Sequence, residues 1–85
     1  MNYKIFIDKS ALKELSKIQL QDQSRVINSI KNLSKNPRPP RNKKLSGRDA
    51  WRIRVGNYRV IYEIHDDRLI ILVINIGHRK DIYRI

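Results

Sequence analysis

Hydrophobic and polar residues alternate with a period of two in several stretches of the chain, a spacing that is typical of β-strands. These stretches cover residues 3–7, about 50–55 and 58–65. A further stretch at 68–76 is apolar at nearly every position from Leu69 onward, which predicts an interior strand covered on both faces. We therefore expect a sheet of four strands.

Between the first two strands the apolar residues recur every three or four positions, which predicts two helices. Asp8 or Ser10 can cap the first helix. Its inward positions are Ala11, Leu12, Leu15 and Ile18. The second helix is expected from about Asp22 to Asn36, because Pro37 disfavours helical backbone in the residue before it. Its inward positions are Val26, Ile27, Ile30 and Leu33.

The resulting order, β-α-α-β-β-β, predicts an α+β fold with both helices packed on one face of a mostly antiparallel four-stranded sheet. We expect one domain over residues 1–85, because no repeat or change in composition marks a boundary. The chain has no cysteine, so neither a disulfide nor a thiolate metal site is expected. It shows no signal-peptide or membrane-spanning stretch, and the expected compartment is the cytoplasm.

A β-hairpin is predicted around Gly56-Asn57, because glycine supplies the positive φ that a type II′ turn needs at its first position. This turn would pair Arg54 with Arg59, and Arg52 with Ile61. Since side chains alternate across a strand, the three arginines share one face of the hairpin. The other face is apolar and carries Trp51, Ile53, Val55, Tyr58, Val60 and Tyr62.

The arginine face of this hairpin has the character of a phosphate-binding surface. Like charges directly opposite each other destabilise a ladder by roughly 0.2–1 kcal/mol, so three arginines together indicate a bound anion. The charge distribution agrees, because residues 38–59 carry +7 of the net charge of +11. We expect RNA or phosphate to be bound by Lys43, Lys44, Arg48 and Arg52. The alternative is a soluble basic protein with no nucleic-acid partner.

The end of the last strand is expected to bring three more residues to the arginine face, namely His78, Arg79 and Tyr83. If the last two strands turn at Asp66-Asp67, Arg59 lies opposite Ile74, close to where the tail begins. Two of these residues also have a simpler explanation. His78 could be an ordinary loop residue, and Tyr83 could pack its ring against the sheet.

This set fits RNA cleavage by attack of a 2′-hydroxyl on the neighbouring phosphate. The reaction needs a base for the 2′-OH, cations for the charge on the phosphate oxygens, and an acid for the leaving 5′-oxygen. Arg54, Arg59 and Arg79 suit the second task, whereas arginine suits proton transfer poorly. His78 is the obvious titrating group, and Tyr83 could stack on a base or orient the 2′-OH. The arginine face lacks paired carboxylates, so neither a metal ion nor another cofactor is expected.

Several motifs, in this order, resemble the RelE family of the RelE/ParE toxin superfamily. They are Lys43-Lys44-Leu45-Ser46-Gly47, the hairpin at 51–62, and the segment 77–83. With the two helices, the resemblance covers nearly the whole chain. It implies a fold like that of microbial ribonucleases and the activity of an mRNA interferase, an endoribonuclease that cuts mRNA in the ribosomal A site. It also implies a cognate RelB-like antitoxin as the neutralising partner.

The resemblance assigns roles by position. Arg52 and Arg54 match the basic pair of the second strand, and Arg59 matches the arginine that supports the scissile phosphate. Arg79 matches the arginine after the last strand, and Tyr83 matches the C-terminal tyrosine. In the best-known members the basic pair is often lysine, one of them the proposed general base, so the identity of the base stays open here.

Two other functions stay open at this point. A ParE-like toxin would poison DNA gyrase by binding it, and a weak duplex-DNA binder would act as a partner-bound repressor. Neither needs proton-transferring residues beside Arg79. His78 and Tyr83 therefore favour the nuclease.

Overall fold

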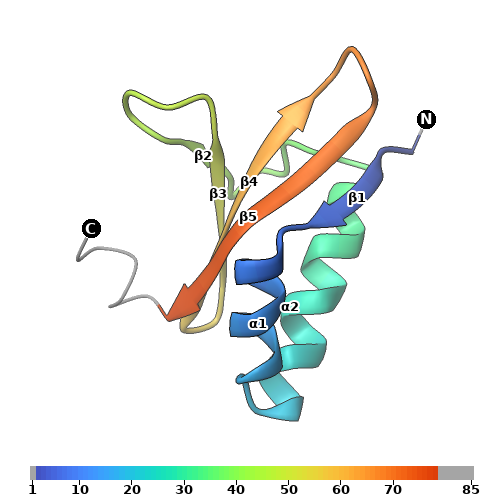
Figure 1. Ribbon diagram of the computed structural model, residues 1–85. Coiled ribbons are helices and arrows are strands. Elements are labelled where there is room, and N and C mark those ends of the chain that lie inside the picture. The colour runs from blue at the N-terminus through green and yellow to red at the C-terminus, as the bar shows by residue number, and fades with distance from the viewer. Residues whose placement is uncertain (1, 79–85) are drawn as a thin grey trace.

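The computed structural model describes residues 2–78, which form two helices and one five-stranded sheet (Figure 1). In chain order the elements are β1 (Lys4–Ile7), α1 (Lys9–Ser16), α2 (Leu20–Leu33), β2 (Lys43–Lys44), β3 (Trp51–Val55), β4 (Tyr58–His65) and β5 (Ile70–His78). The predicted α+β class and the order of its two helices and four longer strands are confirmed. Within the described residues, neither helix is long and apolar enough to cross a membrane.

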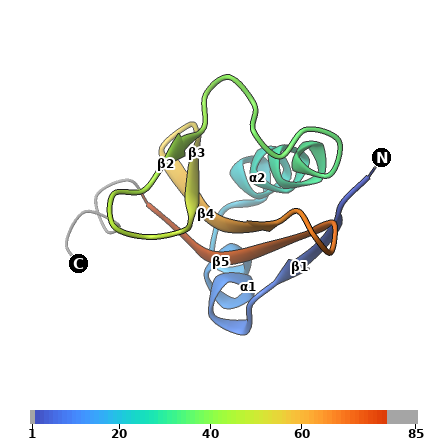
Figure 2. The same cartoon turned by 90° about the horizontal axis from the view of Figure 1, so that it is seen from above.

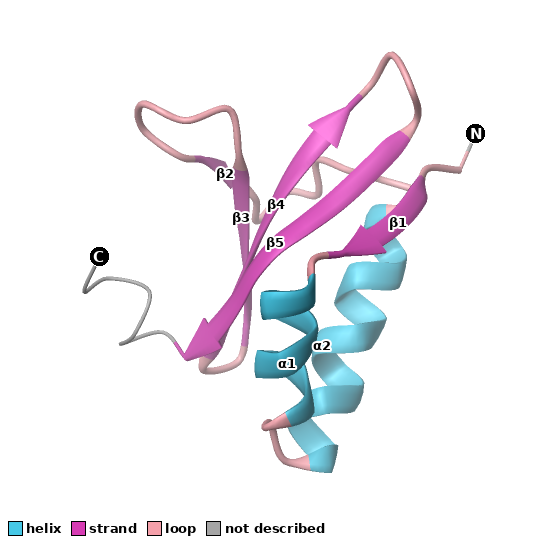
Figure 3. Cartoon of the chain, viewed as in Figure 1, coloured by secondary structure: helices cyan, strands magenta, loops and turns pink. Residues whose placement is uncertain are grey.

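The sheet has five strands rather than the predicted four, because Lys43 and Lys44 form the short strand β2 beside β3 (Figure 3). The strand order is β1-β5-β4-β3-β2, in which only the β1–β5 pair is parallel. As predicted, β5 is an interior strand, and β1 and β2 form the edges. The predicted cover on both faces of β5 is wrong, because Ile71, Val73 and Ile76 are buried whereas Ile70, Leu72 and Ile74 on the opposite face are only half-buried. Two consecutive lysines show no hydrophobic alternation, so the sequence pattern does not mark β2.

The two helices form an antiparallel pair (Figure 1). Asp8 caps α1, because its side chain accepts a hydrogen bond from the Lys9 N–H at 3.1 Å. Between the helices, the Gln23 amide donates to the Leu15 carbonyl at 3.0 Å. The second helix ends at Leu33, earlier than predicted, and its last turn passes into the segment that leads to β2.

The inward position predicted for Leu12 is wrong, because its side chain is 53% exposed. The eight-residue helix α1 buries Ala11 and Leu15, which lie four positions apart on one narrow face. Leu12 is one residue, and therefore about 100°, further round the helix than Ala11. A helix of eight residues covers too little surface to bury both positions.

Both helices cover the same face of the sheet, and the hydrophobic core lies between the helices and that face. The helices contribute Ala11, Leu15, Val26, Ile30 and Leu33. The sheet contributes alternate residues of its strands, namely Ile53, Val55, Val60, Tyr62, Ile71, Val73 and Ile76. The apolar face predicted for the hairpin is this inner face, so the opposite, helix-free face carries the arginines.

The pairing of β4 with β5 differs by three residues from the prediction. Arg59 pairs with Gly77 and not with Ile74. Two of the three residues come from the turn, which runs from 66 to 69 and ends in left-handed backbone at Leu69, with φ of 54°. Leucine seldom adopts this backbone, so the sequence favours a tighter turn. A β-bulge at Ile61/Tyr62 adds the third residue.

Candidate phosphate-binding site

The β3–β4 hairpin has the geometry predicted from the sequence. Gly56 has a φ of +60° and Asn57 does not have a positive φ, as a type II′ turn requires. Arg54 pairs with Arg59, and Arg52 pairs with Ile61. The three arginines therefore project from the same face of two adjacent strands.

These arginines line a hollow of about 460 Å³, which we call the arginine hollow. Its other wall is the segment that leads into β2, which arches from the end of α2 to the hairpin (Figure 2). The lining residues are Pro40, Arg41, Asn42, Lys43, Arg52, Arg54 and Arg59. Five of these seven side chains are cationic and none is acidic, so the hollow attracts anions. Within residues 2–78, His, Cys, Asp and Glu side chains form no group of three that could hold a metal ion.

Arg59 is the most buried of these cations. It is 1% exposed, whereas Arg54 is exposed and Arg52 is half-buried. Burial restricts the side chain and reduces screening by water, so the charge of Arg59 acts more strongly on a nearby anion. The sequence predicted that this arginine supports the scissile phosphate but gave no sign of its burial.

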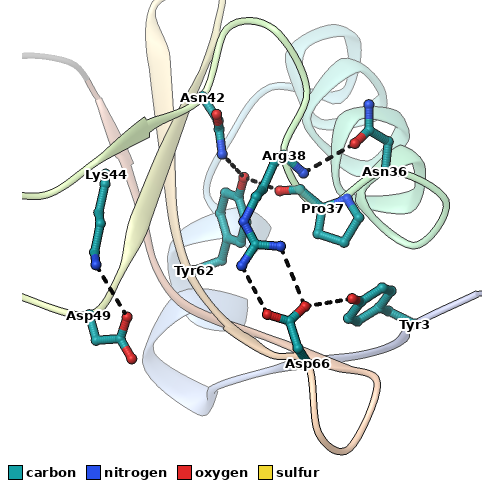
Figure 4. Close-up of polar contacts among 9 residues, drawn as sticks. All are labelled: Tyr3, Asn36, Pro37, Arg38, Asn42, Lys44, Asp49, Tyr62 and Asp66. Atoms are coloured by element: carbon teal, nitrogen blue, oxygen red, sulfur yellow. Dashed lines mark hydrogen bonds and ion pairs between the residues drawn. The ribbon is translucent and has the colours of Figure 1, made fainter.

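An ion pair that the sequence did not reveal holds the arching segment at its start (Figure 4). Arg38 Nη2 donates to Asp66 Oδ2 at 2.9 Å, and the Tyr3 hydroxyl donates to Asp66 Oδ1 at 2.6 Å. The Arg38 guanidinium also lies 5.2 Å from the centre of the Trp51 ring, within cation–π range. The hydrogen bonds from Arg38 and Tyr3 lower the pKa of Asp66, and the bond to Asp66 raises the pKa of Tyr3.

Tyr62 holds the same segment from inside the core. Its hydroxyl donates to the Pro37 carbonyl at 2.7 Å and accepts from the Asn42 amide at 3.4 Å (Figure 4). Burial raises the pKa of Tyr62, so the neutral donor persists across the physiological range. Hydrogen bonds between residues so far apart in sequence leave no local pattern, which is why neither anchor was predicted.

The predicted phosphate ligands divide into two groups. Lys43 lines the hollow, whereas the Lys44 ammonium lies 3.9 Å from the Asp49 carboxylate (Figure 4). Arg48 is exposed in the loop before β3 and does not line the hollow. The structure thus brings together Lys43, Arg52, Arg54 and Arg59, and it adds Arg41 and Asn42, which sequence reasoning missed. Only the basic character of the segment 38–44 could have pointed to Arg41.

His78 lies away from the arginine hollow, so the expectation that it approaches Arg54 and Arg59 is wrong. It pairs with Tyr58, and the two rings meet edge to face with centroids 5.5 Å apart. Directly paired residues share a face, and the face of Tyr58 is the one that carries the helices. The cause is the length of β5, which still includes His78 and so fixes the side of its ring. Arg79 and Tyr83 lie outside the described residues.

Comparison with known proteins places this geometry in a family context. A family model described as the ParE toxin of the type II toxin–antitoxin system, parDE, matches residues 5–83. The mRNA interferase toxin RelE of Escherichia coli K12 is 27% identical over 82 residues, which are 94% of this chain and 86% of that protein.

Solved structures agree with the sequence comparison. A chain of the archaeal RelE–RelB complex from Pyrococcus horikoshii OT3 superposes with a TM-score of 0.84 at 28% identity, covering 93% of this chain and 97% of that one. A chain of the intact E. coli RelBE toxin–antitoxin complex gives 0.78 at 29% identity, covering 89% and 95%. The likeness thus extends over nearly the whole chain in sequence and in fold.

Proposed function

We propose a function from the premise that the chain belongs to the RelE/ParE family of type II toxin–antitoxin systems, as a RelE-type toxin. The proposed activity is ribosome-dependent endonucleolytic cleavage of mRNA in the A site, which inhibits translation in the cytoplasm. The observation that carries the proposal is the arginine hollow, which is lined by the buried Arg59 and by four other cations.

In this proposal the scissile phosphate lies in the arginine hollow. The 2′-oxygen loses its proton and attacks phosphorus, and the bond to the 5′-oxygen breaks as that oxygen gains a proton, leaving a 2′,3′-cyclic phosphate and a 5′-OH. Attack of water on the cyclic phosphate would then give the 3′-phosphate. Arg54 and Arg59 stabilise the negative charge that grows on the phosphate oxygens during this step. Arg52 and Lys43 bind flanking phosphates, and no metal ion takes part.

Proton transfer is the step for which the hollow is least equipped. Arginine transfers protons poorly, and the position of His78 beside Tyr58 does not support a role as base. Arg79 and Tyr83 keep their proposed roles in charge stabilisation and in orienting the 2′-OH. We propose that the ribosome contributes the alignment of the reacting atoms, an effect of up to about 7–11 kcal/mol. Naked RNA should therefore be cut slowly.

The proposed partner in the resting cell is a RelB-like antitoxin with an acidic segment. Two of the solved relatives are complexes of RelE with RelB. A domain with a net charge of +11 attracts an acidic partner over long range and speeds its association. Purification from the native operon should therefore yield a bound small protein, and its absence would count against this partner.

Induction of the chain in cells tests the activity. Newly formed mRNA 5′ ends are mapped on a translated transcript and on the same transcript without its start codon. We expect new ends only on the translated copy. Intact mRNA together with arrested DNA supercoiling would instead support the gyrase alternative, although the mRNA interferase name of a relative favours the nuclease.

Arg59 provides the sharpest variants for the same assay with purified ribosomes. Loss of one well-placed charge stabiliser lowers a rate by about 10²–10³, so Arg59→Ala should cut that much more slowly while ribosome affinity changes little. Arg59→Lys keeps the charge but loses the planar fork of donors, and it should also lose much of the rate. Arg68→Ala, in the exposed β4–β5 turn, is the control. A normal cleavage rate in Arg59→Ala would refute the phosphate-binding role.

A further inference from the structure

A second hollow, of about 430 Å³, adjoins the arginine hollow and differs from it in character. The two share Pro40, Arg41 and Arg54, so they lie on either side of the same short segment. The floor of the second hollow is apolar and consists of Leu33 and Ile53, both core residues. Its size is in the range of sites for small organic ligands, about 300–1,000 Å³.

The uncharged polar side chains of this second hollow come from the C-terminal half of α2 and the residues just after it, and its charged ones are Arg41 and Arg54. The carboxamides of Asn32 and Asn36 line it, and we call it the amide hollow. Asn36 Oδ1 accepts a hydrogen bond from the Arg38 N–H at 3.2 Å, which orients this amide (Figure 4). A carboxamide presents a donor and an acceptor side by side, the combination that pairs with the edge of a nucleobase. No acidic side chain lines the amide hollow.

We propose that the amide hollow binds one base of a single-stranded RNA whose phosphate occupies the arginine hollow. This inference rests on the proposed function. Sequence-specific proteins hold unpaired bases by stacking, often on guanidinium planes, and by hydrogen bonds to the base edges. Here Arg41 and Arg54 supply the guanidinium groups, the buried floor supplies apolar contact, and Asn32 supplies an accessible amide.

The continuity of the two hollows favours a nucleotide over other occupants. Arg41 and Arg54 line both, so a ligand that joins a charged group to a flat, polar-edged group meets matching chemistry on each side. A base linked through ribose to its phosphate is such a ligand. An apolar peptide side chain would use the floor but would not use the exposed Asn32 amide or the guanidinium groups of Arg41 and Arg54, which makes it a poorer match.

Binding of cleavage-resistant RNA by the full-length chain tests the inference. The probes are a 2′-O-methyl trinucleotide and three copies of it, each lacking a different base, with inorganic phosphate as the anion control. Stacking and edge contacts contribute about 1–3 kcal/mol per base, so removal of one particular base should weaken binding about fivefold or more. The side-chain amide NMR signals of Asn32 and Asn36 should shift only when that base is present.

A pair of matched variants locates the effect. Asn32→Ala should narrow the difference in affinity between the trinucleotide and the copy that lacks the recognised base, with phosphate binding unchanged, and it should alter the sequence preference of cleavage on the ribosome. Asn28→Ala is the control, because Asn28 is exposed one turn earlier on α2 and lines neither hollow. It should behave like the unchanged chain.

Each other result has a distinct meaning. Equal binding of all four trinucleotides to the unchanged chain, with phosphate still bound, would overturn the base site and leave the proposed nuclease intact. If neither phosphate nor any trinucleotide binds and translated mRNA stays uncut, the proposed function fails as well. An acidic peptide that shifts the Asn32 and Asn36 signals where the trinucleotide does not would show the amide hollow to be a protein-binding site.

Discussion

Arg59 combines near-complete burial with a position directly opposite Arg54 in the hairpin. Removing a guanidinium from water has a large desolvation cost, and a like charge across the ladder adds repulsion. Neither term helps the domain to fold. A phosphate bound between the two side chains, as proposed, would offset both terms.

Arg59→Met separates these two contributions, because methionine keeps much of the side-chain length and removes the charge. We expect the free energy of unfolding to stay the same or to rise by about 1 kcal/mol, while ribosome-dependent cleavage falls steeply. Urea denaturation and the cleavage assay measure the two effects. Arg52→Met, at a half-buried position, is the matched control for stability. Marked destabilisation of Arg59→Met would show that this arginine holds the fold together.

Tyr62 makes the opposite kind of contribution, since its hydroxyl stabilises the protein and lies outside the arginine hollow. Tyr62→Phe leaves the Pro37 carbonyl without its 2.7 Å donor and should lower the free energy of unfolding by about 1 kcal/mol. The segment 37–42 would also be held less firmly, and because residues 40–42 line the arginine hollow, RNA affinity should fall as well. Thermal denaturation and RNA binding test both effects. Unchanged RNA affinity would show that Asp66 and Arg38 suffice to hold the segment.

At the scale of elements, the two hairpins show what a sequence can specify. Gly56 marks the β3–β4 turn in the sequence, because only glycine readily takes the positive φ of that position. The pairing of β3 with β4 and the two faces of the hairpin were therefore predicted correctly. The β4–β5 turn ends in a leucine with left-handed backbone, so its length and the position of His78 were not predictable from residue types. Similarly, β2 is defined by its pairing with β3, which no pattern in Lys43-Lys44 indicates. Leu12 is exposed because α1 is short.

The β4–β5 turn also carries Asp66, whose ion pair with Arg38 gives stability that depends on pH. The folded pKa of this carboxyl lies below its ordinary value of 3.8, so the stabilisation is present above that value and is lost as the pH falls through the folded pKa. Asp66→Asn should therefore be less stable than the unchanged chain at pH 7, and the difference should vanish in acid. Urea midpoints at pH 7, 5 and 3 measure it, with Asp67→Asn as the control. A difference that does not shrink between pH 5 and pH 3 would assign the effect to packing.

At the scale of the whole molecule, the fold places some of the basic side chains in the arginine hollow and others, such as Lys44 and Arg48, outside it. Sequence reasoning located the basic segment and the arginine face, because charge and strand alternation are local properties. It could not tell which lysine of Lys43-Lys44 turns toward the arginines, since that depends on the pairing of β2 with β3. Nor could it show Arg41 at the junction of the two hollows, because an arching segment has no periodicity to read.

The two lysines of β2 allow the effect of a charge inside the arginine hollow on RNA affinity to be compared with the effect of an equal charge outside it. Lys43 lines the hollow, whereas Lys44 lies beside Asp49, so the two variants change the net charge equally but the hollow unequally. Each phosphate contact to a single strand contributes about 0.7 to the slope of log affinity against log salt. Lys43→Ala should therefore flatten that slope by about this amount, and Lys44→Ala should leave it nearly unchanged. Equal slopes for the two variants, measured with single-stranded RNA from low to physiological salt, would mean that affinity follows net charge and that the hollow does not select the phosphate.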